Sequence, residues 1–177
     1  MTPTILVAGV GNIFLGDDAF GVEVARSLFR RRLPDNVLVK DFGIRGFDLA
    51  YALLDPWDAV ILVDAMPHGE VPGTLYVVEP NLAGAGDPAS YDMALNPHAM
   101  DPVRVINLAT SMGKITASIL LVGCEPNDFG DELDGRMGLS SLVQASVEEA
   151  SNMVEELIER ILEPKKLRPI QLQTVER

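Results

Sequence analysis

Short apolar runs alternate with helical periodicities along most of the chain. Runs rich in β-branched residues predict strands, and apolar residues spaced three or four apart predict the helices between them. The expected strands cover residues 4–8, 37–42, 59–65, 73–79 and 115–123, and the expected helices begin at residue 19 or cover residues 46–54, 102–112 and 141–162. This alternation predicts an α/β fold, namely a three-layer α/β/α sandwich with a mostly parallel twisted sheet of about five strands and helices on both faces.

Three local patterns refine this expectation. The run AVILVDA at residues 59–65 is apolar on both faces until Asp64, which is typical of a central parallel strand. Asp17 or Asp18 is the expected N-cap of the first helix. Ser141 and Gln144 have the spacing of a capping box at the start of the last helix.

The length of the chain bounds its domain organisation. With 177 residues, it can hide about 70% of its extended surface, which is enough for one core and too little for two ordinary domains. We expect a single domain over residues 1–163 and a flexible C-terminal tail over residues 164–177. Residues 80–100 form an expected long loop that is rich in Pro, Gly and Asn, and loops of this length are often functional.

Composition excludes several classes of partner. The 14 basic and 26 acidic residues give a net charge of −12, which argues against nucleic acid as a partner. No apolar run approaches the ~20 residues of a membrane span. The lone Cys124 excludes a disulfide scaffold and fits a reducing compartment. The first basic residue is Arg26, so a secretion signal is not expected. We therefore expect a cytoplasmic monomer with no nucleic-acid or membrane partner.

Candidate chemistry lies where the expected strands end, because ligands of open α/β sheets bind beyond the carboxyl ends of the strands. Asp18 follows the first strand, Asp64 ends the third, and His98 lies in the loop after the fourth. Two carboxylates and an imidazole are competent ligands for a divalent transition metal. Each also has a plain structural reading, as a helix cap, a strand-end cap or a surface histidine. The acidic loop that begins at Glu125 is most simply a solvated segment.

The glycines after the first strand suggest an alternative. Gly9 and Gly11 begin like a dinucleotide fingerprint, but Phe14 stands where the third glycine is required. We expect these two glycines to form a tight turn that presents Asp18. A non-catalytic Rossmann-like module that binds a nucleotide or small ligand remains the competing hypothesis. A nucleoside or phosphate hydrolase is a third possibility, although Arg45 is the one basic residue expected at the strand ends.

A more specific pattern spans Gly9 to Gly21, with the sequence GVGNIFLGDDAFG. It resembles the N-terminal signature of the hydrogenase maturation proteases, endopeptidases that trim the C-terminal extension of the large subunit of nickel–iron hydrogenases. The resemblance covers about residues 4–162. It continues in order at Val63-Asp64-Ala65, Pro97-His98, Val122-Gly123 with Pro126, and Gly138-Leu139-Ser140.

The resemblance implies a site and a substrate. The metal-contacting positions of the family fall on Asp18, Asp64 and His98. The implied partner is a nickel-loaded large-subunit precursor, whose own nickel is the metal contacted, and no permanent organic cofactor is implied. Peptide hydrolysis could use the metal to polarise a carbonyl or activate water, or a carboxylate as general base. Ile44-Arg45 departs from a Thr-containing version of the family segment, which leaves the class of hydrogenase open.

Overall fold

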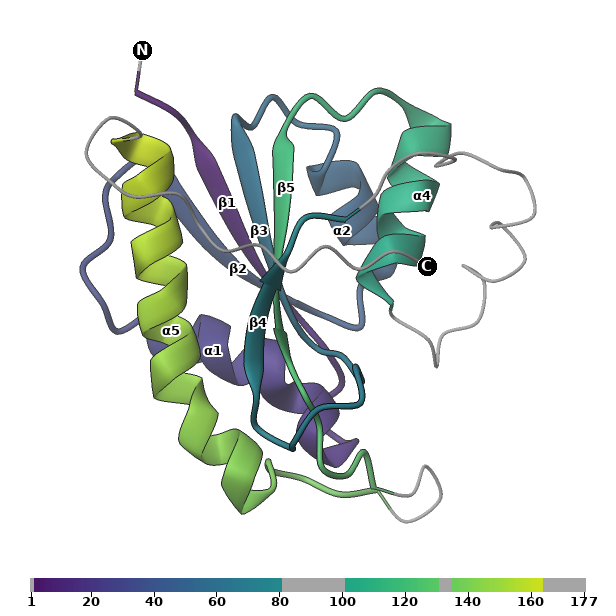
Figure 1. The fold of residues 1–177 in the computed structure, drawn as a ribbon. Coiled ribbons are helices and arrows are strands. Elements are labelled where there is room, and N and C mark those ends of the chain that lie inside the picture. Colours follow the sequence, from purple (N-terminus) through teal and green to yellow (C-terminus); the bar gives the residue numbers. More distant parts are fainter. Residues whose placement is uncertain (1, 81–100, 131–134, 164–177) are drawn as a thin grey trace.

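The computed structural model describes residues 2–80, 101–130 and 135–163, so His98 and the expected tail lie outside the described residues. A five-stranded sheet has the order β2-β1-β3-β5-β4 (Figure 1). Four strands are parallel, and β4 pairs antiparallel with β5 at one edge. The strands are β1 Ile5–Val10, β2 Val37–Gly43, β3 Ala59–Ala65, β4 Leu75–Val78 and β5 Ser118–Cys124. The predicted mostly parallel sheet is confirmed.

Helices cover both faces of the sheet, as predicted. The 3-10 helix η1 (Gly16–Ala19) leads into α1 (Phe20–Leu28), which lies with α5 (Ser141–Leu162) on one face, while α2 (Gly46–Ala52) and α4 (Pro102–Met112) lie on the other (Figure 1). None of the described helices is long and apolar enough to span a membrane. The three-layer α/β/α sandwich is confirmed.

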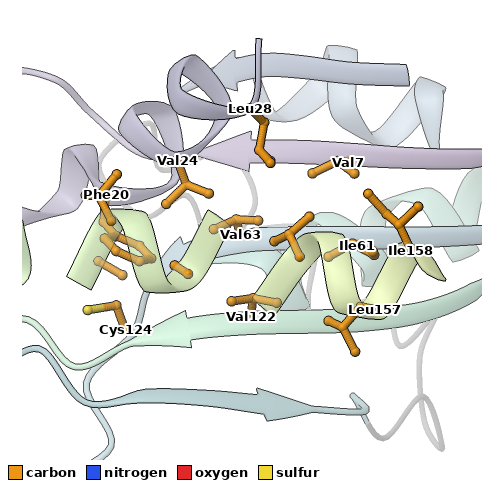
Figure 2. Close-up of a cluster of buried hydrophobic side chains, with 14 of the residues drawn as sticks. Val7, Phe20, Val24, Leu28, Ile61, Val63, Val122, Cys124, Leu157 and Ile158 are labelled. Carbon is orange, nitrogen blue, oxygen red and sulfur yellow. The ribbon is translucent and has the colours of Figure 1, made fainter. Parts of the chain in front are cut away.

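Two apolar layers hold the sandwich together. Every residue of β1 and β3 is buried, so these strands contribute side chains to both layers. Figure 2 shows the layer beneath α1 and α5, in which the labelled side chains are Val7, Phe20, Val24, Leu28, Ile61, Val63, Val122, Cys124, Leu157 and Ile158. Burying one such Leu, Ile or Phe side chain stabilises the fold by about 1.5–3 kcal/mol. Cys124 is a packed core residue at the end of β5.

Two predicted helix caps are wrong. The N-cap of α5 is Ser140, not Ser141, and its hydroxyl donates to the Asp17 carboxylate and makes no cap hydrogen bond to the helix. Asp17 and Asp18 do not cap α1, whose N-cap is Ala19 without a side-chain cap. The carboxylates of Asp17 and Asp18 accept hydrogen bonds from other parts of the chain instead of the first turn of α1, and the Ser140 hydroxyl is used by Asp17.

Candidate functional site

The fold brings Asp18 and Asp64 together at the carboxyl edge of the sheet. Asp18 lies in η1, directly after the loop that follows β1, and Asp64 lies near the end of β3. Asp64 is 3% exposed, and its carboxylate accepts a hydrogen bond from the N–H of Ala65 (2.9 Å). Burial raises the pKa of Asp64 well above its usual value, and the negative charges of Asp18 and Asp101 raise it further. Two predicted site residues therefore lie in one electrostatic environment.

Asp18 is half-buried and has its own restraint. Burial raises its pKa, and a hydrogen bond from the N–H of Asn12 to Oδ2 (2.7 Å) opposes that rise. A pair of partly desolvated carboxylates with raised pKa values favours either a shared proton or a bound cation. This pair alone does not complete a metal site, because the described residues contain no group of three or more metal-binding side chains.

Asp101 adds an acidic group that the sequence pattern did not indicate. Its carboxylate caps α4 by accepting a hydrogen bond from the N–H of Val103 (2.9 Å), and Pro102 occupies the first helical position. Its charge also acts on Asp64, so the start of α4 belongs to the same edge of the sheet. The signal available in the sequence was the Asp-Pro pair, which is typical of a helix start.

Asp17, the neighbour of Asp18, is fully buried, and its carboxylate is satisfied by hydrogen bonds from other parts of the chain. Its two carboxylate oxygens accept hydrogen bonds from the backbone of Asn127, Asp128 and Ser140 and from the Ser140 hydroxyl. Burial would raise the pKa of Asp17, but these hydrogen bonds together lower it. Asp17 is therefore held as an anion. In the sequence, the signal for this contact was that Asp17 and Ser140 both lie in segments of the family resemblance, residues 9–21 and 138–140.

The two glycines of β1 and its following loop have different roles. Gly11 has φ +135°, and a Cβ there would lie 1.7 Å from the carbonyl oxygen of Asp18, so the expected turn that presents Asp18 is confirmed at this position. Gly9 lies within β1, where a Cβ would lie 2.3 Å from the carbonyl oxygen of Gly21 and 2.8 Å from the Cβ of Ala25. The expectation that Gly9 forms the turn is wrong, because this glycine permits close packing of α1.

A second group of polar side chains lies on the β4 side of Asp64. Glu125 is buried, so the prediction that it belongs to a solvated loop is wrong. A hydrogen bond from the N–H of His68 to its Oε2 (2.6 Å) compensates for the loss of water around this carboxylate. The Tyr76 hydroxyl donates to the carbonyl oxygen of Met66 (2.5 Å). Burial raises the pKa of Tyr76, and the charges of Glu125 and Asp64 raise it further. Tyr76 therefore remains a neutral hydrogen-bond donor beside Asp64.

A pocket opens between the loops that follow β1 and β2. Its volume is about 300 Å³, at the lower end of the range for ligand sites, and Asn12 in its wall is the residue that bonds to Asp18. Phe14 and Ile44 line the pocket and are 57% and 53% exposed. The pocket can therefore receive an apolar group from solvent, and through Asn12 its wall adjoins Asp18.

The same region does not suit a phosphate. Asp17 and Asp18 occupy the turn before α1, where their negative charge opposes the anion binding that a helix N-terminus would otherwise favour. The Arg45 guanidinium, the basic group suggested for a phosphate clamp, donates to the carbonyl oxygen of Phe42 (3.0 Å). These contacts weigh against the nucleotide-binding and phosphate-hydrolase alternatives.

Known proteins share both the sequence and the fold. A family model described as hydrogenase maturation protease matches residues 22–157. The hydrogenase 2 maturation protease of Escherichia coli (strain K12) is 32% identical over 152 residues, covering 85% of this chain and 87% of that protein. The hydrogenase expression/formation protein HupD of Rhizobium leguminosarum bv. viciae is 34% identical over 134 residues, covering 73% of this chain. The match covers 62% of the HupD length, so this chain aligns with less than two thirds of that relative.

A solved structure agrees with these sequence matches. The hydrogenase maturating endopeptidase HybD from E. coli superposes with a TM-score of 0.68 at 28% identity, covering 89% of this chain and 93% of the other.

Proposed function

Because the chain belongs to the hydrogenase maturation protease family, we propose that it is an endopeptidase that removes the C-terminal extension of a nickel–iron hydrogenase large-subunit precursor. The observation that carries this proposal is the convergence of Asp18 and Asp64 at the carboxyl edge. The charges that raise the pKa of Asp64 are both negative, those of Asp18 and Asp101. A site of this kind attracts a cation, and the proposed substrate carries one.

The cation is the nickel already installed in the precursor, and Asp18, Asp64 and His98 contact it. His98 lies outside the described residues, but it stands three positions before Asp101 in the sequence, and that length of chain spans at most about 11 Å. Since the Asp101 charge acts on Asp64, this connection supports a role for His98 at the same edge. The enzyme needs no permanent organic cofactor, because the substrate supplies both the metal and the remaining ligands.

The pocket beside Asn12 holds the peptide on one side of the scissile bond. Its position next to Asp18 and its exposed Phe14 and Ile44 suit an apolar side chain of the precursor. Binding energy gained there would hold the precursor equally well before and during the reaction, which lowers KM and leaves kcat little changed.

Metal analysis and cleavage assays test the proposal together. The freshly purified enzyme should contain little metal, and mass spectrometry should show cleavage of nickel-loaded precursor and none of nickel-free precursor. A stoichiometric bound zinc whose removal abolishes activity, or efficient cutting of nickel-free precursor, would overturn the nickel requirement. Failure to cut either form of several precursors would overturn the peptidase assignment.

A further inference from the structure

The Asp17 carboxylate joins the turn that carries Asp18 to the segment before α5. Its Oδ1 accepts a hydrogen bond from the N–H of Ser140 (2.6 Å). Its Oδ2 accepts hydrogen bonds from the N–H groups of Asn127 and Asp128 and from the Ser140 hydroxyl (each 2.9 Å). All four donors lie more than 100 positions away in the sequence, and the side chain has no exposed surface.

Backbone hydrogen bonds join the same two segments. The N–H of Gly16 donates to the carbonyl oxygen of Arg136 (2.7 Å), and the N–H of Arg136 donates to that of Phe14 (2.7 Å). The N–H of Asp17 itself donates to the carbonyl oxygen of Asp128 (3.0 Å). The turn before α1 is therefore clamped to the loop after β5 at Asp17 and at two residues before it, Phe14 and Gly16.

Asp18 is held much less directly. The hydrogen bond from the Asn12 N–H restrains one of its carboxylate oxygens, and the close approach at Gly11 fixes the position of its carbonyl group. The direction in which the Asp18 side chain leaves the turn therefore depends on how firmly the turn is anchored, and Asp17 supplies that anchor.

We propose that Asp17 is a positioning residue, which clamps the η1 turn to the β5–α5 loop so that the Asp18 carboxylate meets the nickel of the precursor together with Asp64. This inference rests on the proposed function. It requires a carboxylate at position 17, because four donors converge on two oxygens and an amide would turn an N–H₂ group toward other N–H groups.

The first experiment compares Asp17→Asn with a matched control, Asp58→Asn. Asp58 also accepts hydrogen bonds from a residue distant in the sequence, from the N–H and hydroxyl of Thr4 (2.8 and 3.1 Å), but it precedes β3 at the opposite edge of the sheet. Asp17→Asn should lower the rate of nickel-dependent cleavage by about 10–100-fold, the usual effect of losing an outer-shell partner. Asp58→Asn should leave that rate unchanged.

Ser140 provides a graded test that preserves the charge. Ser140→Ala removes one of the four hydrogen bonds to Asp17 and keeps the backbone one, whereas Ser140→Thr keeps the hydroxyl. We expect about a tenfold loss of turnover for Ser140→Ala and recovery in Ser140→Thr. If Asp17→Asn does not fold, this pair decides, and equal turnover of Ser140→Ala and the parent enzyme would overturn the inference.

A double-mutant cycle separates positioning from stability. Affinity for nickel-loaded precursor is measured for Asp17→Asn, Asp18→Asn and the double variant, with urea unfolding for each. If Asp17 acts through Asp18, Asp17→Asn should cost no further affinity once Asp18 has been changed. An equal loss in both backgrounds would overturn the positioning role. A parent enzyme that neither binds nor cuts the nickel-loaded precursor would instead refute the proposed function, whereas full activity in Asp17→Asn would refute this inference alone.

Discussion

At the scale of single residues, adjacent carboxylates in this chain have opposite electrostatic settings. Hydrogen bonds hold Asp17 as an anion with a lowered pKa, whereas burial raises the pKa of Asp18. Asp64, buried beside Asp18, has the strongest upward shift of the three. Asp17 therefore stabilises the folded protein in its charged form, whereas ionisation of Asp64 opposes folding. The site keeps a destabilising charge where the proposed nickel contact requires it.

Asp64→Asn should therefore stabilise the protein while removing its activity. The raised pKa means that stability is lost as pH rises from the ordinary carboxyl value, about 4, through the folded-state value. The variant should exceed the parent by about 1–2 kcal/mol in unfolding free energy at pH 7 and match it near pH 3. Urea unfolding across this pH range tests the stability, and cleavage should fall by about 10–100-fold or more.

An Asp64→Asn variant that unfolds more readily than the parent at pH 7 would contradict this account of the site. Asp58→Asn again serves as the control. It should lose stability rather than gain it, because Asp58 accepts two hydrogen bonds from Thr4.

At the scale of elements, α1 packs unusually close to the sheet. A Cβ at Gly21 would lie 2.0 Å from the carbonyl oxygen of Val63 and 2.3 Å from that of Val10. The helix that follows Asp18 is thus in contact with the strand that carries Asp64, with no side chain between them. This contact sets how close the helix after Asp18 lies to the strand that carries Asp64.

Gly21→Ala should disturb both the fold and the site. The added methyl group meets backbone that cannot move independently, so we expect a loss of about 1–3 kcal/mol or more in unfolding free energy and reduced cleavage in the variant that remains folded. Gly113→Ala is the matched control, because its new methyl group would meet only the flexible end of Leu54 at 3.2 Å. Urea unfolding of both variants tests the prediction, and equal stability would contradict it.

The sequence predicted elements better than contacts between them. The ranges of α4 and α5 agree with their apolar periodicity, because each helix buries one regular stripe. Asp18 and Asp64 could be placed at one edge because parallel strands end there. The long-range bonds of Asp17 could not be predicted, since its four donors come mostly from the backbone, which has no sequence signature. The role of His98 stays a prediction.

At the scale of the whole molecule, several exposed apolar side chains follow the strands at the carboxyl edge. They come from the loops and helix starts around the carboxylate pair and include Phe14, Ile44, Phe47, Phe129, Met137 and Leu142. Exposed apolar surface of this kind marks binding sites on soluble proteins. The proposed precursor would cover this edge when its peptide enters the pocket.

Replacing the apolar side chains that line the pocket should weaken substrate binding and leave the rate of the chemical step unchanged. Phe14→Ser with Ile44→Ser should raise KM for the precursor about tenfold, equivalent to about 1.4 kcal/mol, with kcat little changed. The control is Phe29→Ser, because Phe29 is 56% exposed, close to the 57% of Phe14, and lies at the far end of α1. Steady-state cleavage assays measure both constants, and an unchanged KM in the double variant would remove the pocket from the substrate path.

The contact between Asp17 and Ser140 also has a consequence for synthesis. These residues touch although they lie 123 positions apart in the chain. At roughly 5–20 residues per second, a ribosome needs on the order of ten seconds to proceed from one to the other. Until Ser140 is made, the turn bearing Asp18 lacks the complete anchor proposed for it. We therefore expect a nascent chain to lack full activity until the segment before its last helix has been made.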